Sequence, residues 1–196
     1  SELKCPVLVH AEDYQECACA MKTEKEKNHD GLNSWSQSRS PDFEVKSIQT
    51  ICEYGRKYDC TIYFVHIGSK SALDQIQLEK NNGTKIFVET CPHYPTLSHE
   101  TQDGYLAKVM PPIRTKNDVE YVWQSLQKNH IDTIGTDHVA NQLKLKLDGD
   151  DVWSALAGFP GIGTSLSILL SEGVNKNRIT LDHLVNLTST NASKIF

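Results

Sequence analysis

The chain has 196 residues, of which 38% are hydrophobic and 23% are charged, a composition typical of a globular protein rather than a disordered one. Its net charge of −5 argues against binding nucleic acid or an anionic membrane through bulk charge. The sequence has no apolar stretch of roughly 20 residues and no visible secretory signal, so we expect a cytoplasmic protein without nucleic-acid or membrane partners.

The first predicted elements are a strand, a helix and a loop. Pro6–His10 is a β-branched run that predicts a buried strand, and Tyr14–His29 predicts a helix. Residues 30–41 are rich in Gly, Asn, Ser and Pro, which predicts a loop. A second helix should follow, because apolar residues then recur on one helical face: Val45, Ile48, Ile51 and Cys52.

The alternation of strands and helices continues along the chain. Further strands are predicted at 60–68, 84–94 and 131–138, and helices at Ser71–Asn81 and 115–129, the latter capped by Asn117 or Asp118. More helical segments are predicted at 152–156, 165–173 and 181–196, the last with Thr180 as N-cap and His183 at the third helical position. Four strands that are each followed by a helix imply an α/β fold with parallel pairing. Without a composition break, residues 1–196 are expected to form a single domain.

Candidate metal ligands stand at the ends of the predicted strands. His10 ends the first strand, His66 the second and Asp137 the fourth, while the third carries Glu89, Cys91 and His93. The carboxyl ends of parallel strands converge on one rim, where imidazole and carboxylate groups can bind zinc. Asp137 could also take a proton from a metal-bound water and return it to a leaving group. For each histidine taken alone, the alternative is a half-buried residue with no function at a strand end.

The six cysteines include no CxxC pair. We therefore expect reduced, mostly buried thiols, as is usual in the cytoplasm. The alternative is a zinc ion held by Cys17 and Cys19, which lacks a second pair of ligands downstream.

A series of motifs resembles the cyclic amidohydrolases, namely hydantoinase, dihydropyrimidinase, dihydroorotase and allantoinase. The motifs occur in order over essentially the whole chain: VHAED, SRSPDFE, YFVHIGS, VETCPHY, VMPPIRTKND, IGTDH and LLSEGVNKNRITLDHLVNLTSTNASKIF. The resemblance implies a TIM barrel with two metal ions, usually zinc, that opens the ring of a small cyclic amide. It implies His10 and His66 as metal ligands after the fifth and sixth strands, and Asp137 as metal ligand and catalytic proton shuttle after the eighth.

The same resemblance implies residues that contact the substrate. Met110 lies in the MPPIR segment and Gly158 in the AGFPG segment, which match segments that line the substrate ring. His138 matches a loop histidine that approaches the substrate in some family members. The motifs lean in different directions, so hydantoin, dihydropyrimidine, dihydroorotate and allantoin all remain open as substrates.

Two features of the family are absent from this sequence. It has neither the HxH pair that follows the first strand of the family nor the carbamylated lysine that follows the fourth. We therefore expect half of a TIM barrel, strands five to eight, without the N-terminal half-barrel and the β-sandwich. Such a chain should form homo-oligomers, bind one zinc ion or none, and have little or no activity alone.

Two other hypotheses compete with an enzyme. One is a barrel relative that has lost catalysis and acts as a structural or assembly protein. The other is a flavodoxin-like fold, which the absence of a glycine-rich phosphate loop after any predicted strand disfavours.

Overall fold

The computed structural model describes residues 5–100 and 104–196, whose strands form one parallel sheet in chain order. The strands are β1 (Val7–Val9), β2 (Ile62–Phe64), β3 (Ile86–Thr90) and β4 (Thr133–Ile134). Phe64 pairs with Val9 on one side and Val88 on the other, and Thr90 pairs with Ile134. The predicted α/β fold with four parallel strands is confirmed.

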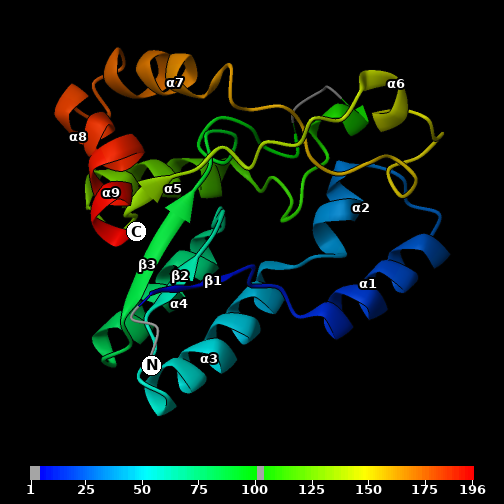
Figure 1. Cartoon of the computed structure of the whole chain (residues 1–196). Helices are drawn as coiled ribbons and strands as arrows, with labels where there is room; N and C mark the ends of the chain where they lie inside the picture. The colour runs from blue at the N-terminus through cyan, green and yellow to red at the C-terminus, as the bar shows by residue number, and fades with distance from the viewer. Residues whose placement is uncertain (1–4, 101–103) are drawn as a thin grey trace.

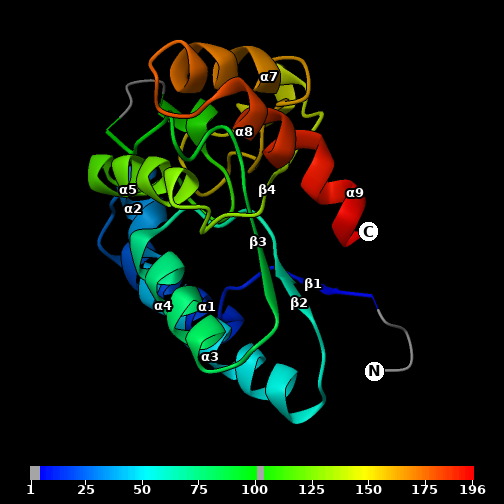
Figure 2. The same cartoon turned by 90° about the vertical axis from the view of Figure 1, so that its left-hand side faces the viewer.

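Helices connect the strands and cover one face of the sheet, as Figures 1 and 2 show for α3 and α4. The α-helices are α1 (Tyr14–Glu26), α2 (Leu32–Gln37), α3 (Pro41–Lys57), α4 (Lys70–Asn81), α5 (Lys116–Gln127), α6 (Leu143–Lys146), α7 (Ser165–Ile168), α8 (Leu181–Val185) and α9 (Asn191–Ile195). The other helical turns are η1 (Gly104–Ala107), which is a 3₁₀ turn, and η2 (Leu169–Val174) and η3 (Asn186–Thr190), which are π-helical.

The main hydrophobic core lies between the sheet and the helices on this face. Ile48 of α3, Ile76 of α4 and Leu126 of α5 pack with Phe64 and Val88 of the sheet, and all five are fully buried. The edge strand β1 is different, because Val7 and Leu8 are 51% and 55% exposed. Consecutive side chains of a strand point to opposite faces, so both faces of β1 are open at these residues. An open edge strand is what half of a closed barrel would show.

The predicted loop at 30–41 contains a helix, α2, so that prediction is wrong. Leu32 and Trp35 stand three residues apart and are both buried in a second apolar cluster with Val109, Ile113 and Val152. The Trp35 indole N–H also donates a hydrogen bond to the carbonyl of Val109, at 2.8 Å. Tertiary packing therefore overrides the turn-forming composition of this segment.

Two further predictions need correction. Residues 152–156 form a turn rather than a helix. The Asp151 carboxylate accepts hydrogen bonds from the backbone N–H and the hydroxyl of Ser154, but no helix continues from this capping contact. The N-cap of α5 is Thr115, which forms a capping box with Asp118. The predicted cap of the C-terminal segment is confirmed, since Thr180 accepts a hydrogen bond from the backbone N–H of His183.

No helix in residues 5–100 and 104–196 is long and apolar enough to cross a membrane. The single-domain assignment of residues 1–196 stays a prediction.

Candidate metal and proton-transfer site

The predicted ligands lie on one rim of the sheet. His10 directly follows β1, His66 stands two residues after β2, and Asp137 stands three residues after β4. All three strands run in parallel, so these positions are at the same edge, from which the long loops of Figure 1 leave the sheet. The predicted convergence of strand ends brings the three residues to one side of the fold.

Two of the three candidate ligands have an unusual backbone conformation. His66 and Asp137 both have a φ of +44°, in the left-handed region that residues other than glycine seldom adopt. Such conformations cost on the order of 1–3 kcal/mol and cluster at functional sites, where the surrounding structure enforces them. Because His66 and Asp137 share this conformation at the ends of two strands, we interpret the rim as a functional site whose side chains are oriented by a strained backbone.

The imidazoles of His10 and His66 are in direct contact. His10 Nδ1 lies 3.0 Å from His66 Nε2, and the ring planes meet at 73°. One of these two nitrogens must carry the proton of the hydrogen bond, and the other must accept it. A contact of this kind between residues 56 positions apart brings together two nitrogens that can each bind a metal ion.

The other ring nitrogen of His10 contacts a buried carboxylate. His10 Nε2 lies 2.7 Å from Oε2 of Glu12, whose side chain is only 2% exposed. Arg39 donates to the same carboxylate through Nε, at 2.9 Å from Oε1, and through Nη2, at 2.5 Å from Oε2. Burial alone would raise the pKa of Glu12, but the hydrogen bonds from His10 and Arg39 outweigh burial and hold that pKa below its usual value.

The second histidine is kept neutral. Burial, and to a smaller degree the charge of His10, lowers the pKa of His66 to about 4. Its Nδ1 is buried and has no hydrogen-bond partner among the described residues. His66 therefore presents a neutral imidazole at physiological pH, the form that binds metal ions.

Asp137 is a half-buried carboxylate. Burial raises its pKa, and the nearby charge of His10 lowers it in part. Burial also raises the pKa of Glu89, which accepts a hydrogen bond from the Tyr63 hydroxyl at 2.8 Å. A carboxylate whose pKa is raised towards 7 is a better proton acceptor at neutral pH.

The residues of this rim fit a zinc ion in part. Within the described ranges no group of three or more His, Cys, Asp or Glu side chains is placed to hold one metal ion. Two nitrogen ligands of a tetrahedral zinc ion, each at about 2.0–2.1 Å, stand roughly 3.3 Å apart, close to the 3.0 Å that separates His10 Nδ1 and His66 Nε2. The histidine pair fits two of the positions around an ion, and Asp137 as a further ligand stays a prediction.

His93 and three of the six cysteines, namely Cys17, Cys52 and Cys91, are buried, so the expectation of mostly buried thiols holds for only half of them. All six cysteines are free thiols; Cys17 is buried whereas Cys19 is exposed, so the two do not share a face of α1. Cys91 is fully buried, and burial raises the pKa of its thiol well above the usual value. His93 is buried against the ring of Phe159, and burial lowers its pKa to about 3.

The predicted substrate residues lie on three separate loops. Met110 is 41% exposed. His138 is exposed, and its Nδ1 accepts a hydrogen bond from the backbone N–H of Gly161 at 3.1 Å, which leaves Nε2 to carry the proton. Gly158 has both backbone groups engaged, because its N–H donates to the carbonyl of Lys108 and its carbonyl accepts from Lys146 Nζ at 2.7 Å. A direct contact between any of these residues and a substrate stays a prediction.

Gly158 is required by local geometry. Its φ is +92°, and a Cβ atom there would lie 2.5 Å from Cγ2 of Val139. The loop that carries Gly158 is held by two buried lysines that the sequence did not single out. Lys146 Nζ donates to the carbonyls of Lys108, Leu156 and Gly158, and Lys108 Nζ donates to the carbonyl of Ala155 at 2.5 Å.

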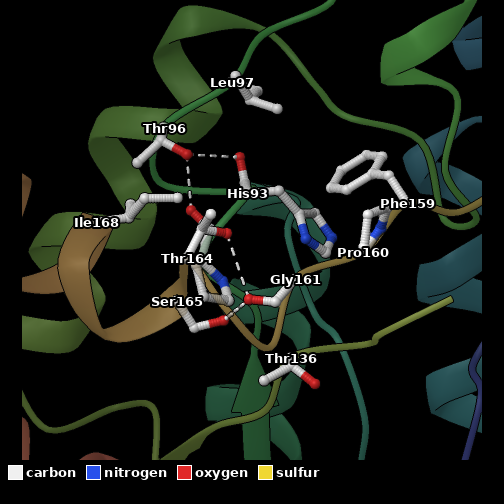
Figure 3. Close-up of a pocket in the computed structure, with 11 residues that line it drawn as sticks. His93, Thr96, Leu97, Thr136, Phe159, Pro160, Gly161, Thr164, Ser165 and Ile168 are labelled. Carbon is white, nitrogen blue, oxygen red and sulfur yellow. Dashed lines mark hydrogen bonds between the residues drawn. The ribbon is translucent and has the colours of Figure 1, made fainter. Parts of the chain in front are cut away.

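A cavity of about 220 Å³ lies beside the rim (Figure 3). Its wall includes His93, Phe159 and Pro160, together with Thr136, the residue before Asp137. On another side, the Thr164 and Ser165 hydroxyls donate to the carbonyl of Gly161. The lining is mostly apolar, so the cavity suits a small apolar group more than an ion.

No family model matches the chain. Individual proteins do match along its whole length. A dihydroorotase of Methanosphaera stadtmanae is 34% identical over 200 residues, and a D-hydantoinase of Geobacillus stearothermophilus is 31% identical over 202 residues. The solved structure of a D-hydantoinase (dihydropyrimidinase) from Thermus sp. superposes on the entire chain with a TM-score of 0.94 and 26% identity.

Along its whole length the chain is similar to members of the cyclic amidohydrolase family, and it fits a C-terminal part of them. It spans 45% and 43% of the length of the two curated relatives and 44% of the solved structure. Its parallel sheet with helices corresponds to half of the TIM barrel of the hydantoinases, as the motifs predicted.

Sequence reasoning missed Glu12, Arg39, Lys108 and Lys146. Glu12 and Arg39 lie inside the quoted motifs VHAED and SRSPDFE, so the motifs themselves were a signal. The two lysines gave no signal, because lysine is rarely buried and most lysines lie on the surface.

Proposed function

We propose that this chain contributes to the active site of a metal-dependent hydrolase that opens the ring of a small cyclic amide. The observation that carries this proposal is the 3.0 Å contact between His10 Nδ1 and His66 Nε2 at the ends of two adjacent parallel strands. The similarity to a dihydroorotase and a D-hydantoinase supports the reaction class. We propose zinc as the metal because neutral imidazole nitrogens are ligands that it prefers.

His10 and His66 would hold the ion, with Asp137 beside them on the rim. When bound, zinc would polarise the amide carbonyl and a water molecule. Asp137 would accept the proton of the attacking water and transfer it to the ring nitrogen that leaves. Its half-buried position supports this role, because burial raises the pKa of its carboxyl towards neutrality.

We propose that the substrate lies between Met110, His138 and the loop around Gly158. His138 would offer its Nε2–H as a donor to a substrate carbonyl, since its Nδ1 is already used by the backbone N–H of Gly161. Met110 can offer only its thioether, a weak acceptor. These groups suit a small ring with carbonyl oxygens, a description that covers hydantoin, dihydrouracil, dihydroorotate and allantoin.

The test is an assay of ring opening for these four compounds, with the full-length gene product and with this chain alone, in the presence and absence of a chelator. We expect activity of the full-length product that the chelator abolishes. Asp137→Asn should lower turnover by roughly 10²–10⁴-fold while the fold is retained. Asp182→Asn, which changes an exposed carboxylate on α8, is the matched control and should leave turnover unchanged. Activity that survives both the chelator and Asp137→Asn would disprove the mechanism.

We also propose that the chain works as part of a larger assembly, with itself or with further protein. Val7 and Leu8 of the edge strand β1 are more than half exposed, and open strand edges with apolar side chains favour association. Light scattering should therefore detect oligomers of the isolated chain. A stable monomer at high concentration would contradict this proposal.

One observation favours a second candidate, a barrel relative without catalytic activity that acts in assembly. The described residues contain no group of three metal ligands placed around one point. Under this hypothesis the chain and its full-length product would bind no metal, and all four substrates would stay intact.

A further inference from the structure

We infer that Glu12 and Arg39 are positioning residues for His10: they fix which of its ring nitrogens carries the proton, and so aim the Nδ1 lone pair at the metal position. The inference rests on the proposed function for the identity of the ion, but not for the tautomer of His10 itself.

The first step concerns the proton on His10. An ionised carboxylate only accepts hydrogen bonds, and Glu12 Oε2 lies 2.7 Å from His10 Nε2. The hydrogen must therefore be on Nε2. In a neutral imidazole this leaves Nδ1 unprotonated, with its lone pair directed at His66, 3.0 Å away.

The second step concerns the rigidity of Glu12. Arg39 contacts both oxygens of the carboxylate, so the group cannot rotate without breaking a charge-assisted bond. The guanidinium is itself 5.2 Å from the centre of the Trp35 ring, which the carbonyl of Val109 holds through the indole N–H. The orientation of His10 is thus fixed through a chain of contacts that reaches the second apolar cluster.

The third step concerns His66. Since His10 Nδ1 accepts, His66 Nε2 must donate, and His66 Nδ1 is then an unprotonated nitrogen, buried without a partner in the described part of the chain. A buried polar atom without a partner is costly, and it lies on the one ring that faces His10. A divalent cation of zinc type would replace the shared proton, which would move to His66 Nδ1 or to solvent. The Glu12 carboxylate therefore orients the histidine pair so that it can bind a cation, as is common for histidine ligands of metal ions.

The test starts with the metal-free chain and ¹⁵N–¹H NMR of its histidine rings. We expect His10 in the tautomer with hydrogen on Nε2. In Glu12→Gln the side chain keeps its shape but its amide can turn its NH₂ group towards Nε2. The Nδ1 signal should then move towards the position of a protonated nitrogen. A zinc titration against a chromophoric chelator should give an affinity lower by roughly 10- to 100-fold.

Glu79→Gln is the matched control. Glu79 is a 7% exposed carboxylate of α4 that accepts hydrogen bonds from Arg56 of α3 and from Gln75. This change should alter neither the tautomer of His10 nor the zinc affinity. Arg39→Lys, which keeps the positive charge but loses the double contact, should shift both readouts in the direction of Glu12→Gln and by less.

Three results would overturn the inference. The first is wild-type His10 with its hydrogen on Nδ1. The second is an unchanged tautomer and zinc affinity in Glu12→Gln, or, should that variant not fold, in Arg39→Lys. The third is an equal change in Glu12→Gln and Glu79→Gln. Failure of the wild-type chain to bind zinc would instead overturn the proposed metal, and the tautomer would still decide the role of Glu12.

Discussion

The β1 end of the rim is held by paired charges, whereas the loop after β4 is held by ammonium groups on backbone carbonyls. His10 is aligned by Glu12 and Arg39 through contacts of 2.5–2.9 Å. On the other side, Lys146 bonds three carbonyls and Lys108 bonds the carbonyl of Ala155, and neither lysine forms an ion pair within the described residues.

The difference follows from what each region must position. A histidine ligand needs one nitrogen aimed at a point, which a carboxylate on its other nitrogen achieves. The loop around Gly158 needs its backbone shaped, and the three N–H donors of one ammonium group can gather three carbonyls. Charge pairing therefore orients a side chain at one end, and a buried cation folds a loop at the other.

The largest loss of stability among the changes that test this comparison is expected from Lys146→Met. The change removes the donor that Lys146 supplies to the carbonyls of Lys108, Leu156 and Gly158. The Lys108 carbonyl keeps the N–H of Gly158, and the Gly158 carbonyl keeps the amide of Asn141. We expect a loss of roughly 3–5 kcal/mol in the free energy of unfolding, measured by urea denaturation. Lys144→Met, on the exposed face of the same helix α6, is the control and should change it by less than about 0.5 kcal/mol. Equal losses of stability in the two variants would show that Lys146 has no special structural role.

The pH dependence of stability should have the same direction at the two ends but should fall in different pH ranges. The pKa of His66 is about 4 in the folded chain and near 6.5 when unfolded, so the unfolded state binds more protons between these values. Stability should therefore fall by about 3 kcal/mol as pH drops from 6.5 to 4. His66→Gln should flatten this part of the curve, and an unchanged slope would contradict the burial of a neutral His66.

At the other end, burial lowers the pKa of Lys146 to about 8, below the value near 10.5 in the unfolded chain. The unfolded state again binds more protons in that window, so the contribution of Lys146 to stability rises as pH increases from about 8 to 10.5. Chemical denaturation across this range, compared with Lys146→Met, measures that contribution. A contribution that falls with rising pH would show that Lys146 depends on its charge more than on burial.

A smaller effect is expected at Gly158. Gly158→Ala combines a positive φ with a Cβ atom 2.5 Å from Val139 Cγ2, whereas Gly83→Ala has a φ of +88° and no atom within 4 Å. The difference between the two variants isolates the clash, and we expect Gly158→Ala to cost about 2 kcal/mol more. Equal losses of stability would mean that the loop moves away freely and is not held by its lysines.

Much of the fold and part of the rim could be predicted from the sequence. Apolar runs that end in His10, His66 and Asp137 indicated four strands and their functional ends, because local patterning sets both. The helix α2 was missed, since its stability comes from Trp35 packing against residues more than 70 positions away. Glu12 and Arg39 as a pair, and the burial of Lys108 and Lys146, depend on tertiary contacts that no local pattern encodes.

The central claim is that His10 and His66 form two ligands of one metal ion. Zinc added to crystals of the protein tests it directly through the anomalous signal at the zinc absorption edge. Our account predicts one strong peak within bonding distance, about 2.0–2.1 Å, of both His10 Nδ1 and His66 Nε2, and its loss in His66→Ala. A zinc peak at full occupancy beside other residues, with the hydrogen bond between the two imidazoles still present, would contradict the account.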